Sequence, residues 1–172
     1  MARWANPRTG ASIESSVDGG DLVIERVMKP HTGKADAHRH MDYVETYEVL
    51  EGTATIHLDG ERRTLGPGER LEVPPGVGHV NPYNETDADL RHRHRISAPG
   101  RPFAEAFVSA LGHHMENGTV NDQGEFSDLQ LFVVLHGTRA QSFRTGIPIP
   151  LQKAVLPLGA ALGRRRGLKP SY

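Results

Sequence analysis

Cysteine is absent from the 172 residues, so the chain has no disulfide, no thiolate nucleophile and no metal site built on sulfur. An excess of one charge is also lacking, because 20 Lys and Arg against 21 Asp and Glu leave a formal net charge of -1 at pH 7. That balance supplies no overall attraction to nucleic acid or to an anionic membrane. No apolar segment approaches the ~20 residues that a membrane span needs, and the first ten residues contain no signal-peptide core. We therefore expect a cytoplasmic protein without nucleic-acid or membrane partners.

The length allows one substantial hydrophobic core with an appendage rather than two full domains. Ten histidines, several of them closely spaced, are the unusual feature of the composition. Because sulfur ligands are excluded, any metal in this chain is held by nitrogen and oxygen.

Residues 22–97 consist of short apolar or alternating runs separated by turn residues, which is typical of an antiparallel all-β domain. Asp59-Gly60 lies between two of these runs and has the sequence of a type I′ hairpin turn. About eight strands at this spacing fit a jelly roll or a small barrel. The expected strands are 22–28, 37–42, 45–50, 53–58, 62–65, 70–73, 79–83 and 88–97.

The pattern changes at Ala98-Pro99-Gly100, after which apolar residues at helical spacing predict a helix over 103–114. Ser127 can cap a second helix over 129–136, although the same run also fits a buried strand. A third helix is expected from residue 150, with a kink at Pro157 and three arginines near its end. The apolar residues on one face of this helix are Leu151, Val155, Leu158 and Leu162.

These patterns predict a β domain over residues 1–98 and a helical extension over residues 99–172. Three short helices bury too little apolar surface to fold alone, so their apolar faces are expected to pack on the outside of the β domain or on a second subunit. Exposed edge strands and an amphipathic tail make a homodimer the expected assembly.

A metal site is indicated by three histidines and one glutamate. His38 and His40 lie two residues apart in an expected strand, so both side chains project from the same face with Cα atoms roughly 6.5 Å apart. Glu45 follows after a short turn and can add an oxygen ligand. His79 follows the rigid turn 74–78, which can direct its side chain toward the same point. Imidazole and carboxylate ligands together suit a divalent transition metal.

The spacing of these residues resembles the two motifs of the cupin family. The first motif, an HxH pair followed by a glutamate and a glycine, is matched by His38, His40, Glu45 and Gly52. The second motif, in which a glycine precedes PxG and a histidine, is matched by Gly68, Pro74, Gly76 and His79. The chain departs from the family pattern at Gly33, which is one residue closer to the HxH pair than usual, and at Tyr83, which replaces an asparagine.

The resemblance covers residues 33–97 and implies a double-stranded β-helix, the jelly-roll barrel of cupins, followed here by the α-helical extension. It also implies one divalent transition metal inside the barrel, which is Fe, Mn, Ni, Co or Zn. The implied ligands of this metal are His38, His40, Glu45 and His79.

The last expected strand alternates regularly. Leu90 and Ile96 mark its apolar face, so His92 and His94 on the same face are expected to point inward and Arg91, Arg93 and Arg95 outward. Histidine titrates near neutral pH, and His92 and His94 are therefore candidates for a catalytic acid or base. The alternatives are the opposite register, or buried histidines that only bond to nearby carbonyls.

Residues that share the inward face of neighbouring strands form the expected substrate pocket. The hydroxyl of Tyr47 can hold a substrate or simply complete the core. The expected pocket residues are Tyr47, Val49, Leu90 and Ile96.

An octahedral ion with four protein ligands keeps about two positions for water, O2 or a substrate. The leading hypothesis is therefore a metal-dependent enzyme acting on a small oxygenated organic substrate, with O2-dependent oxidation placed slightly ahead of non-redox isomerase, cyclase or lyase chemistry. The alternative from another class is a module that binds a small molecule without changing it. Sugar-phosphate isomerisation ranks lower, because phosphate requires inward Arg or Lys and the arginines of the last strand are expected to point outward.

Overall fold

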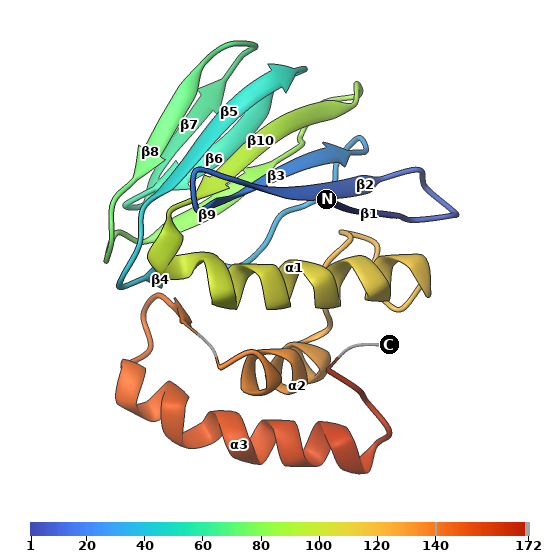
Figure 1. Cartoon of the computed structure of the whole chain (residues 1–172), viewed down its shortest axis with the longest axis vertical. Coiled ribbons are helices and arrows are strands. Elements are labelled where there is room, and N and C mark those ends of the chain that lie inside the picture. Colours follow the sequence, from blue (N-terminus) through green and yellow to red (C-terminus); the bar gives the residue numbers. More distant parts are fainter. Residues whose placement is uncertain (140, 171–172) are drawn as a thin grey trace.

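The computed structural model describes residues 1–139 and 141–170, which form two antiparallel β-sheets and three α-helices (Figure 1). The strands are β1 (Ala2–Ala5), β2 (Ser12–Asp18), β3 (Asp21–Met28), β4 (His38–His40), β5 (Glu45–Glu51), β6 (Ala54–Leu58), β7 (Glu61–Leu65), β8 (Arg70–Val73), β9 (His79–Tyr83), β10 (Leu90–Ile96) and β11 (Ser142–Arg144). The helices are α1 (Arg101–Glu116), α2 (Asp128–Gly137) and α3 (Ile149–Arg165).

The strand order brings distant parts of the sequence together. The larger sheet has the order β1-β2-β3-β10-β5-β8, and the smaller has the order β11-β4-β9-β6-β7. Pairing of β4 with β9 places His38 directly opposite His79. In the larger sheet, β10 lies between β3 and β5, so the histidines of β10 have neighbours on both sides.

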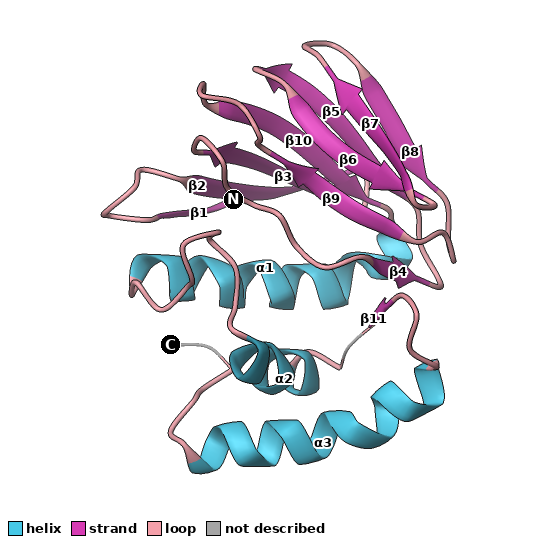
Figure 2. Ribbon diagram, turned by 180° about the vertical axis from the view of Figure 1, so that it is seen from behind, coloured by secondary structure: helices cyan, strands magenta, loops and turns pink. Residues whose placement is uncertain are grey.

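The core consists of two clusters of buried apolar side chains. One cluster lies between strands of the two sheets and contains Met28, Tyr47, Val49, Ala54, Ile56, Leu65, Val73 and Leu90. The other joins β1, β2, β3 and the end of β10 to α1, which runs along that side of the sheets (Figure 2). Within this second cluster Gly112 of α1 lies against the ring of Trp4, where an added Cβ would come within 2.2 Å of the indole.

Helices α2 and α3 form a separate layer beyond α1 (Figure 1). The two helices pack through small residues, since an added Cβ on Gly159 would lie 2.6 Å from the ring of Phe132 and one on Gly163 would lie 2.4 Å from Val133. Four large apolar residues of α3 are exposed, namely Leu151, Val155, Leu158 and Leu162, whereas Ile149 and Leu156 are half-buried. Of the two arrangements expected for this face, packing on the outside of the sheets is not found among the described residues, and packing on a second subunit stays a prediction. Among the described residues, no helix combines the length and the apolarity needed to cross a membrane.

The eight strands expected between residues 22 and 97 are present as β3 to β10, and the three expected helices are present. Asp59 and Gly60 have φ values of 51° and 85°, which confirms the type I′ turn. The run at 129–136 is helical, with the Ser127 side chain accepting a hydrogen bond from the backbone N–H of Gln130, so its interpretation as a buried strand is wrong. Three strands were not expected, namely β1, β2 and β11.

Candidate metal centre

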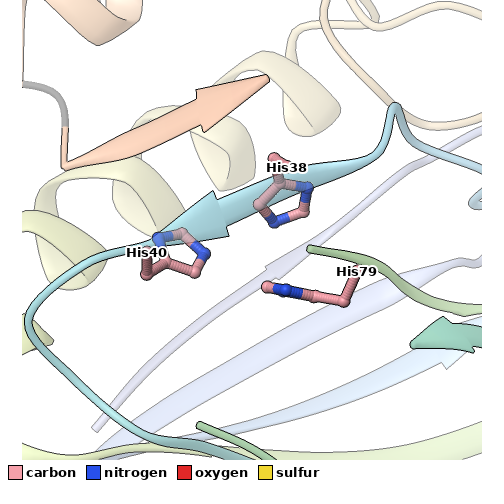
Figure 3. Close-up of side chains that lie close together, drawn as sticks. All are labelled: His38, His40 and His79. Carbon is pink, nitrogen blue, oxygen red and sulfur yellow. The ribbon is translucent and has the colours of Figure 1, made fainter. Parts of the chain in front are cut away.

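The imidazoles of His38, His40 and His79 form one cluster (Figure 3). Each offers a ring nitrogen, and these nitrogens all lie within 4.8 Å of one another. The ring centroids of His38 and His79 are 4.4 Å apart, and those of His38 and His40 are 5.0 Å apart. The structure thus brings together the three histidines that the sequence singled out, two from β4 and one from β9.

Hydrogen bonds at Nδ1 fix the tautomer of each imidazole, that is, which ring nitrogen carries the hydrogen. Nδ1 of His38 lies 2.8 Å from the carbonyl oxygen of Asp36, and Nδ1 of His79 lies 3.2 Å from that of Val77. A carbonyl oxygen only accepts, so each Nδ1 carries the hydrogen and each Nε2 keeps a lone pair. The Gln141 carbonyl, 3.4 Å from Nδ1 of His40, favours the same tautomer there. All three Nε2 atoms are therefore available for a cation.

Tyr43 supports His40 and was not anticipated from the sequence. Its ring stacks on the imidazole with centroids 4.5 Å apart, and its hydroxyl contacts Nδ1 of His40. Gly100 also packs against the Tyr43 ring, where an added Cβ would come within 2.4 Å of Cγ. The available signal was that Tyr43 follows His40 by three residues in the turn before β5, but the contact depends on how that turn folds. A hydrogen-bond partner at the second ring nitrogen, as Tyr43 provides here, holds a metal-ligating histidine in one orientation.

Burial keeps the histidines neutral. Desolvation lowers the pKa of His38 to about 4 and that of His40 to about 3, so both imidazoles keep their lone pairs at neutral pH. Nε2 of His79 is buried and has no hydrogen-bond partner in the part of the chain that the structure describes, although it lies 2.8 Å from Oε2 of Glu45. Neutral imidazoles and an unpaired buried nitrogen are the donor set that a divalent transition metal requires, so the residues present fit such an ion.

Glu45 adjoins the cluster but shares its carboxylate with other groups. Oε1 lies 3.5 Å from Nε2 of His40 and 3.0 Å from Nε2 of His94, and the Tyr47 hydroxyl donates to Oε2 over 3.2 Å. Burial raises the pKa of Glu45, but the interactions with His94, His79 and His40 together outweigh this effect and leave the pKa well below its usual value. An ionised carboxylate thus faces two of the three clustered histidines.

Both histidines of β10 point inward, and the alternation predicted for this strand is confirmed by its burial pattern. Tyr47 stacks on His94 with centroids 4.3 Å apart, so this ring is fixed beside Glu45. Neither ring nitrogen of His92 has a hydrogen-bond partner among the described residues. Desolvation, with Arg26 nearby, keeps the pKa of His92 well below its usual value. His94 therefore contacts the cluster through Glu45, whereas His92 lies two residues earlier on the same inward face of β10.

Arg26 is an inward cation that the sequence reasoning missed. It lies directly across from His92 in the pairing of β3 with β10 and forms a 3.4 Å ion pair with Glu125. It also lines a cavity of about 220 Å³, together with Arg8 and the loop 121–124. The signal was available, because Leu22, Ile24, Arg26 and Met28 share one face of the strand and three of them are plainly apolar. The low rank given to sugar-phosphate isomerisation rested on the outward arginines of β10 alone.

The four residues expected to line a substrate pocket are buried in two core clusters. Tyr47, Val49 and Leu90 belong to the core cluster between the sheets, whereas Ile96 packs in the cluster that includes α1. The hydroxyl of Tyr47 is the polar group of the set, and it bonds to Glu45 and, over 2.7 Å, to Oδ1 of Asn81. Of the four, Tyr47 is the one that contacts the candidate metal centre.

The helical extension reaches the centre through β11. Ser142 pairs with His40 and Arg144 pairs with His38, so β11 covers the outer edge of the strand that carries both histidines. The backbone N–H of Thr145 donates to the carbonyl of Ala37 over 3.0 Å. This pairing completes the hydrogen bonds of β4 and holds its short three-residue strand in place.

The low pKa of His40 predicts a pH dependence of stability in chelator-treated protein. The unfolded chain takes up a proton on this imidazole below pH 6.5, whereas the folded chain does so only near pH 3. Its contribution is complete above pH 6.5 and is lost as the pH falls from 6.5 toward 3, by up to about 1.4 kcal/mol per pH unit. Urea unfolding at pH 7.5, 6 and 5, values that span the upper part of this window, gives the free energy of unfolding at each pH. This free energy should fall less steeply with decreasing pH in His40→Ala than in the unaltered chain. Equal slopes would show that the imidazole is not held neutral by the fold.

Comparison with known proteins agrees with the motifs. Residues 24–96 match the family described as "Cupin domain". No protein of curated function matches the chain. Among solved structures, the chain is similar to a Cupin 2 conserved barrel domain protein from Salinispora arenicola, at 22% identity over 52% of this chain and 76% of that one, with a TM-score of 0.43.

Two further solved structures are similar over little more than half of this chain. One is a conserved protein with a double-stranded β-helix domain from Klebsiella pneumoniae, at 18% identity over 55% of this chain and 84% of that one, with a TM-score of 0.46. The other is a sugar phosphate isomerase of a cupin superfamily from Silicibacter pomeroyi, at 24% identity over 56% of this chain and 71% of that one, with a TM-score of 0.47.

Proposed function

Residues 24–96 of this chain form a cupin domain, and from that premise we propose that the protein is a metal-dependent enzyme acting on a small, oxygen-bearing organic substrate. The observation that carries the proposal is the cluster of His38, His40 and His79, whose Nε2 atoms are left free beside the ionised carboxylate of Glu45. In this proposal strands β1 to β10 form a double-stranded β-helix over residues 1–98, and residues 99–172 are an extension that adds β11 to the smaller sheet.

A divalent Fe, Mn, Ni, Co or Zn ion held by His38, His40 and His79, with Glu45 as a fourth ligand, would polarise a substrate oxygen or bring O2 and substrate together. His94 is the proposed acid or base, since its Nε2 lies 3.0 Å from Oε1 of Glu45 and its ring is held by stacking on Tyr47. His92 is the alternative for that role, because both of its ring nitrogens are unpaired within the described residues.

Arg26 narrows the proposed substrate to an anion. Glu45, His94, His92 and Arg26 lie on the inner face of three adjacent strands and form a polar track across the larger sheet. The Arg26 guanidinium at the end of this track, which also pairs with Glu125 over 3.4 Å, would bind a carboxylate or phosphate through its N–H groups. In this proposal Arg26 supplies the inward cation whose absence ranked phosphate-bearing substrates low.

Oxidation by O2 and non-redox chemistry both remain within this proposal. We rank O2-dependent oxidation first, because three imidazoles and one carboxylate suit redox-active Fe and Mn. The second candidate is an isomerase, cyclase or lyase, favoured by the hydrogen-bonded set of Glu45, His94 and Tyr47, which suits proton transfer to and from a substrate.

Oxygen uptake separates the two. Chelator-treated protein loaded with Fe(II) should consume O2 in proportion to substrate when offered a panel of small hydroxy and keto acids. Turnover at an unchanged rate without O2 would overturn oxidation in favour of the second candidate. If every substrate is recovered unchanged from protein loaded with each of Fe, Mn, Ni, Co and Zn, the enzyme proposal is overturned. The remaining hypothesis is then a module that binds a small molecule without changing it.

The same panel tests Arg26 when each acid is paired with its neutral amide. Losing a hydrogen bond to a charged group costs roughly 1.5–3 kcal/mol, so Arg26→Gln should reduce the preference for acid over amide in kcat/KM by about 10- to 150-fold. The matched control is Arg91→Gln, which removes an outward arginine of β10 and should leave the preference intact. An undiminished preference in Arg26→Gln would remove this residue from substrate binding.

A further inference from the structure

The outer face of α3 is apolar and exposed. Leu151, Val155, Leu158 and Leu162 recur at intervals of four, three and four residues, so they form one stripe along the helix. Their exposed fractions are 55%, 41%, 69% and 47%. Because α3 contacts α2 through Gly159, Ala160 and Gly163, the stripe faces away from the rest of the chain, at the outermost layer in Figures 1 and 2.

The charge of this region differs sharply from that of the rest of the protein. Residues 149–170 contain five basic residues and no acidic residue. The remaining 15 basic and 21 acidic residues leave the rest of the chain at -6, so the overall value of -1 conceals a strongly basic end. The basic residues of the segment are Lys153, Arg164, Arg165, Arg166 and Lys169.

Two of the arginines lie beside the stripe. Arg165 and Arg166 follow Leu162 by three and four residues, which places them on its side of the helix at the C-terminal end. Among the described residues, no acidic side chain forms an ion pair with any of Arg164, Arg165 and Arg166. Within residues 1–139 and 141–170, the stripe therefore ends in a cluster of cations whose charge no acidic side chain neutralises.

We propose that α3 is a membrane-surface helix that binds an anionic lipid bilayer, with the stripe inserted at the level of the headgroups and the arginines on lipid phosphates. An apolar face combined with Lys and Arg and little acidic charge is the pattern of helices that lie in a bilayer interface. Such a helix does not span the membrane. The expectation of no membrane partner was drawn from the overall charge and does not account for this local asymmetry.

A second copy of the chain is the competing occupant, and the charges oppose it. If two α3 helices packed antiparallel along the stripe, the arginines of each would meet Lys153 and the positive N-terminal end of the other helix. If they packed parallel, the two arginine clusters would meet each other. Neither arrangement offers an acidic residue of α3 to compensate, whereas anionic headgroups neutralise the cluster in any orientation.

Co-sedimentation of the full chain with vesicles tests the proposal. We expect binding to phosphatidylcholine vesicles that contain about one-third phosphatidylserine, and much weaker binding to phosphatidylcholine alone. At ~1 M salt, where charges are screened within about 3 Å, the binding should fall steeply. Replacing Arg164, Arg165 and Arg166 together by glutamine should weaken binding on the order of 100-fold.

Two matched substitutions separate the stripe from general surface effects. Leu158→Glu places a charge in the middle of the stripe at an exposed position and should weaken vesicle binding by at least about 10-fold without changing the circular dichroism or the thermal unfolding midpoint. Val17→Glu makes a comparable change at a 51% exposed position on β2 and should leave binding unchanged.

Three results would overturn the proposal. They are no difference between anionic and neutral vesicles, an equal loss of binding in Val17→Glu and Leu158→Glu, and a dimer in sedimentation equilibrium that Leu158→Glu dissociates while vesicles bind neither form. The last of these would assign the stripe to a second copy of the chain.

Discussion

Replacing His40 by alanine is expected to lower the affinity for a divalent transition metal by at least about 100-fold while leaving the fold intact. Loss of a group that only orients a ligand costs 10- to 100-fold in affinity, and loss of the ligand itself should cost at least the upper end of that range. His40 is a buried neutral imidazole whose Nε2 lies 3.5 Å from Oε1 of Glu45, so alanine removes one of the three ring nitrogens of the cluster. Competition with a chromogenic chelator measures the affinity, and circular dichroism checks the fold.

Controls make this result specific. His57→Ala removes a histidine whose Nε2 bonds to the hydroxyl of Tyr83, away from the cluster, and should leave the affinity unchanged. His38→Ala removes a ligand that is less buried than His40, and should lower the affinity in the same way with less risk to folding. If His40→Ala and His38→Ala both kept full affinity while folded, the three histidines would not be metal ligands.

Replacing Gly52 by alanine is expected to destabilise the protein by roughly 3–4 kcal/mol, which is large for a single substitution. Gly52 has a φ of 80°, where a side chain is strained, and an added Cβ would lie 2.4 Å from the carbonyl oxygen of Asp89. That oxygen belongs to the backbone just before β10, so relief of the clash would shift the strand that carries His92 and His94. Urea unfolding monitored by circular dichroism measures the loss.

Gly60 provides a matched control for this substitution. Its φ of 85° is nearly the same, but nothing lies within 4 Å of an added Cβ. Gly60→Ala should therefore cost only the strain of the left-handed backbone, about 1–2 kcal/mol. An equal loss in the two variants would mean that the contact with Asp89 contributes nothing, and that the glycine of the first motif is needed for its backbone angle alone.

The strands of the β domain could be predicted because their residues alternate and their turns carry glycine, proline and aspartate. β9 was expected at 79–83 and is His79–Tyr83, and β8 was expected at 70–73 and is Arg70–Val73. β2 was missed because Ile13 is the one fully buried apolar residue of its seven. β11 has three residues and no period to detect, and its partner β4 lies about a hundred residues earlier.

The clustered histidines were predictable because the motif spacing fixes which strands they occupy. Their supporting contacts were not, since Tyr43 and the Gln141 carbonyl reach His40 only through the shape of a turn and through the path of the extension. Arg26 shows a different kind of omission. Its position on the inner face follows from the alternation of β3, but arginine seldom occupies a buried face, so its residue type argued against that placement.

The third helix shows where periodicity misleads. Its stripe of large apolar residues is present as predicted, but within this chain the stripe does not cover the β domain, which was one of the two arrangements expected for it. The helix instead buries Ala160 and Gly163, and with the half-buried Gly159 these small residues allow the backbone of α3 to approach α2 closely. Small residues carry little weight in an apolar pattern, so the sequence alone did not reveal which of the two faces is covered.

The most direct test of the central claim is the metal content of the whole 172-residue chain, purified without chelators or a histidine tag. Inductively coupled plasma mass spectrometry measures the metal bound per chain. The cluster of His38, His40 and His79 predicts one divalent transition metal ion per chain, either as isolated or after exposure to Fe, Mn, Ni, Co and Zn in turn. A folded chain that retains none of the five ions after desalting would contradict the account.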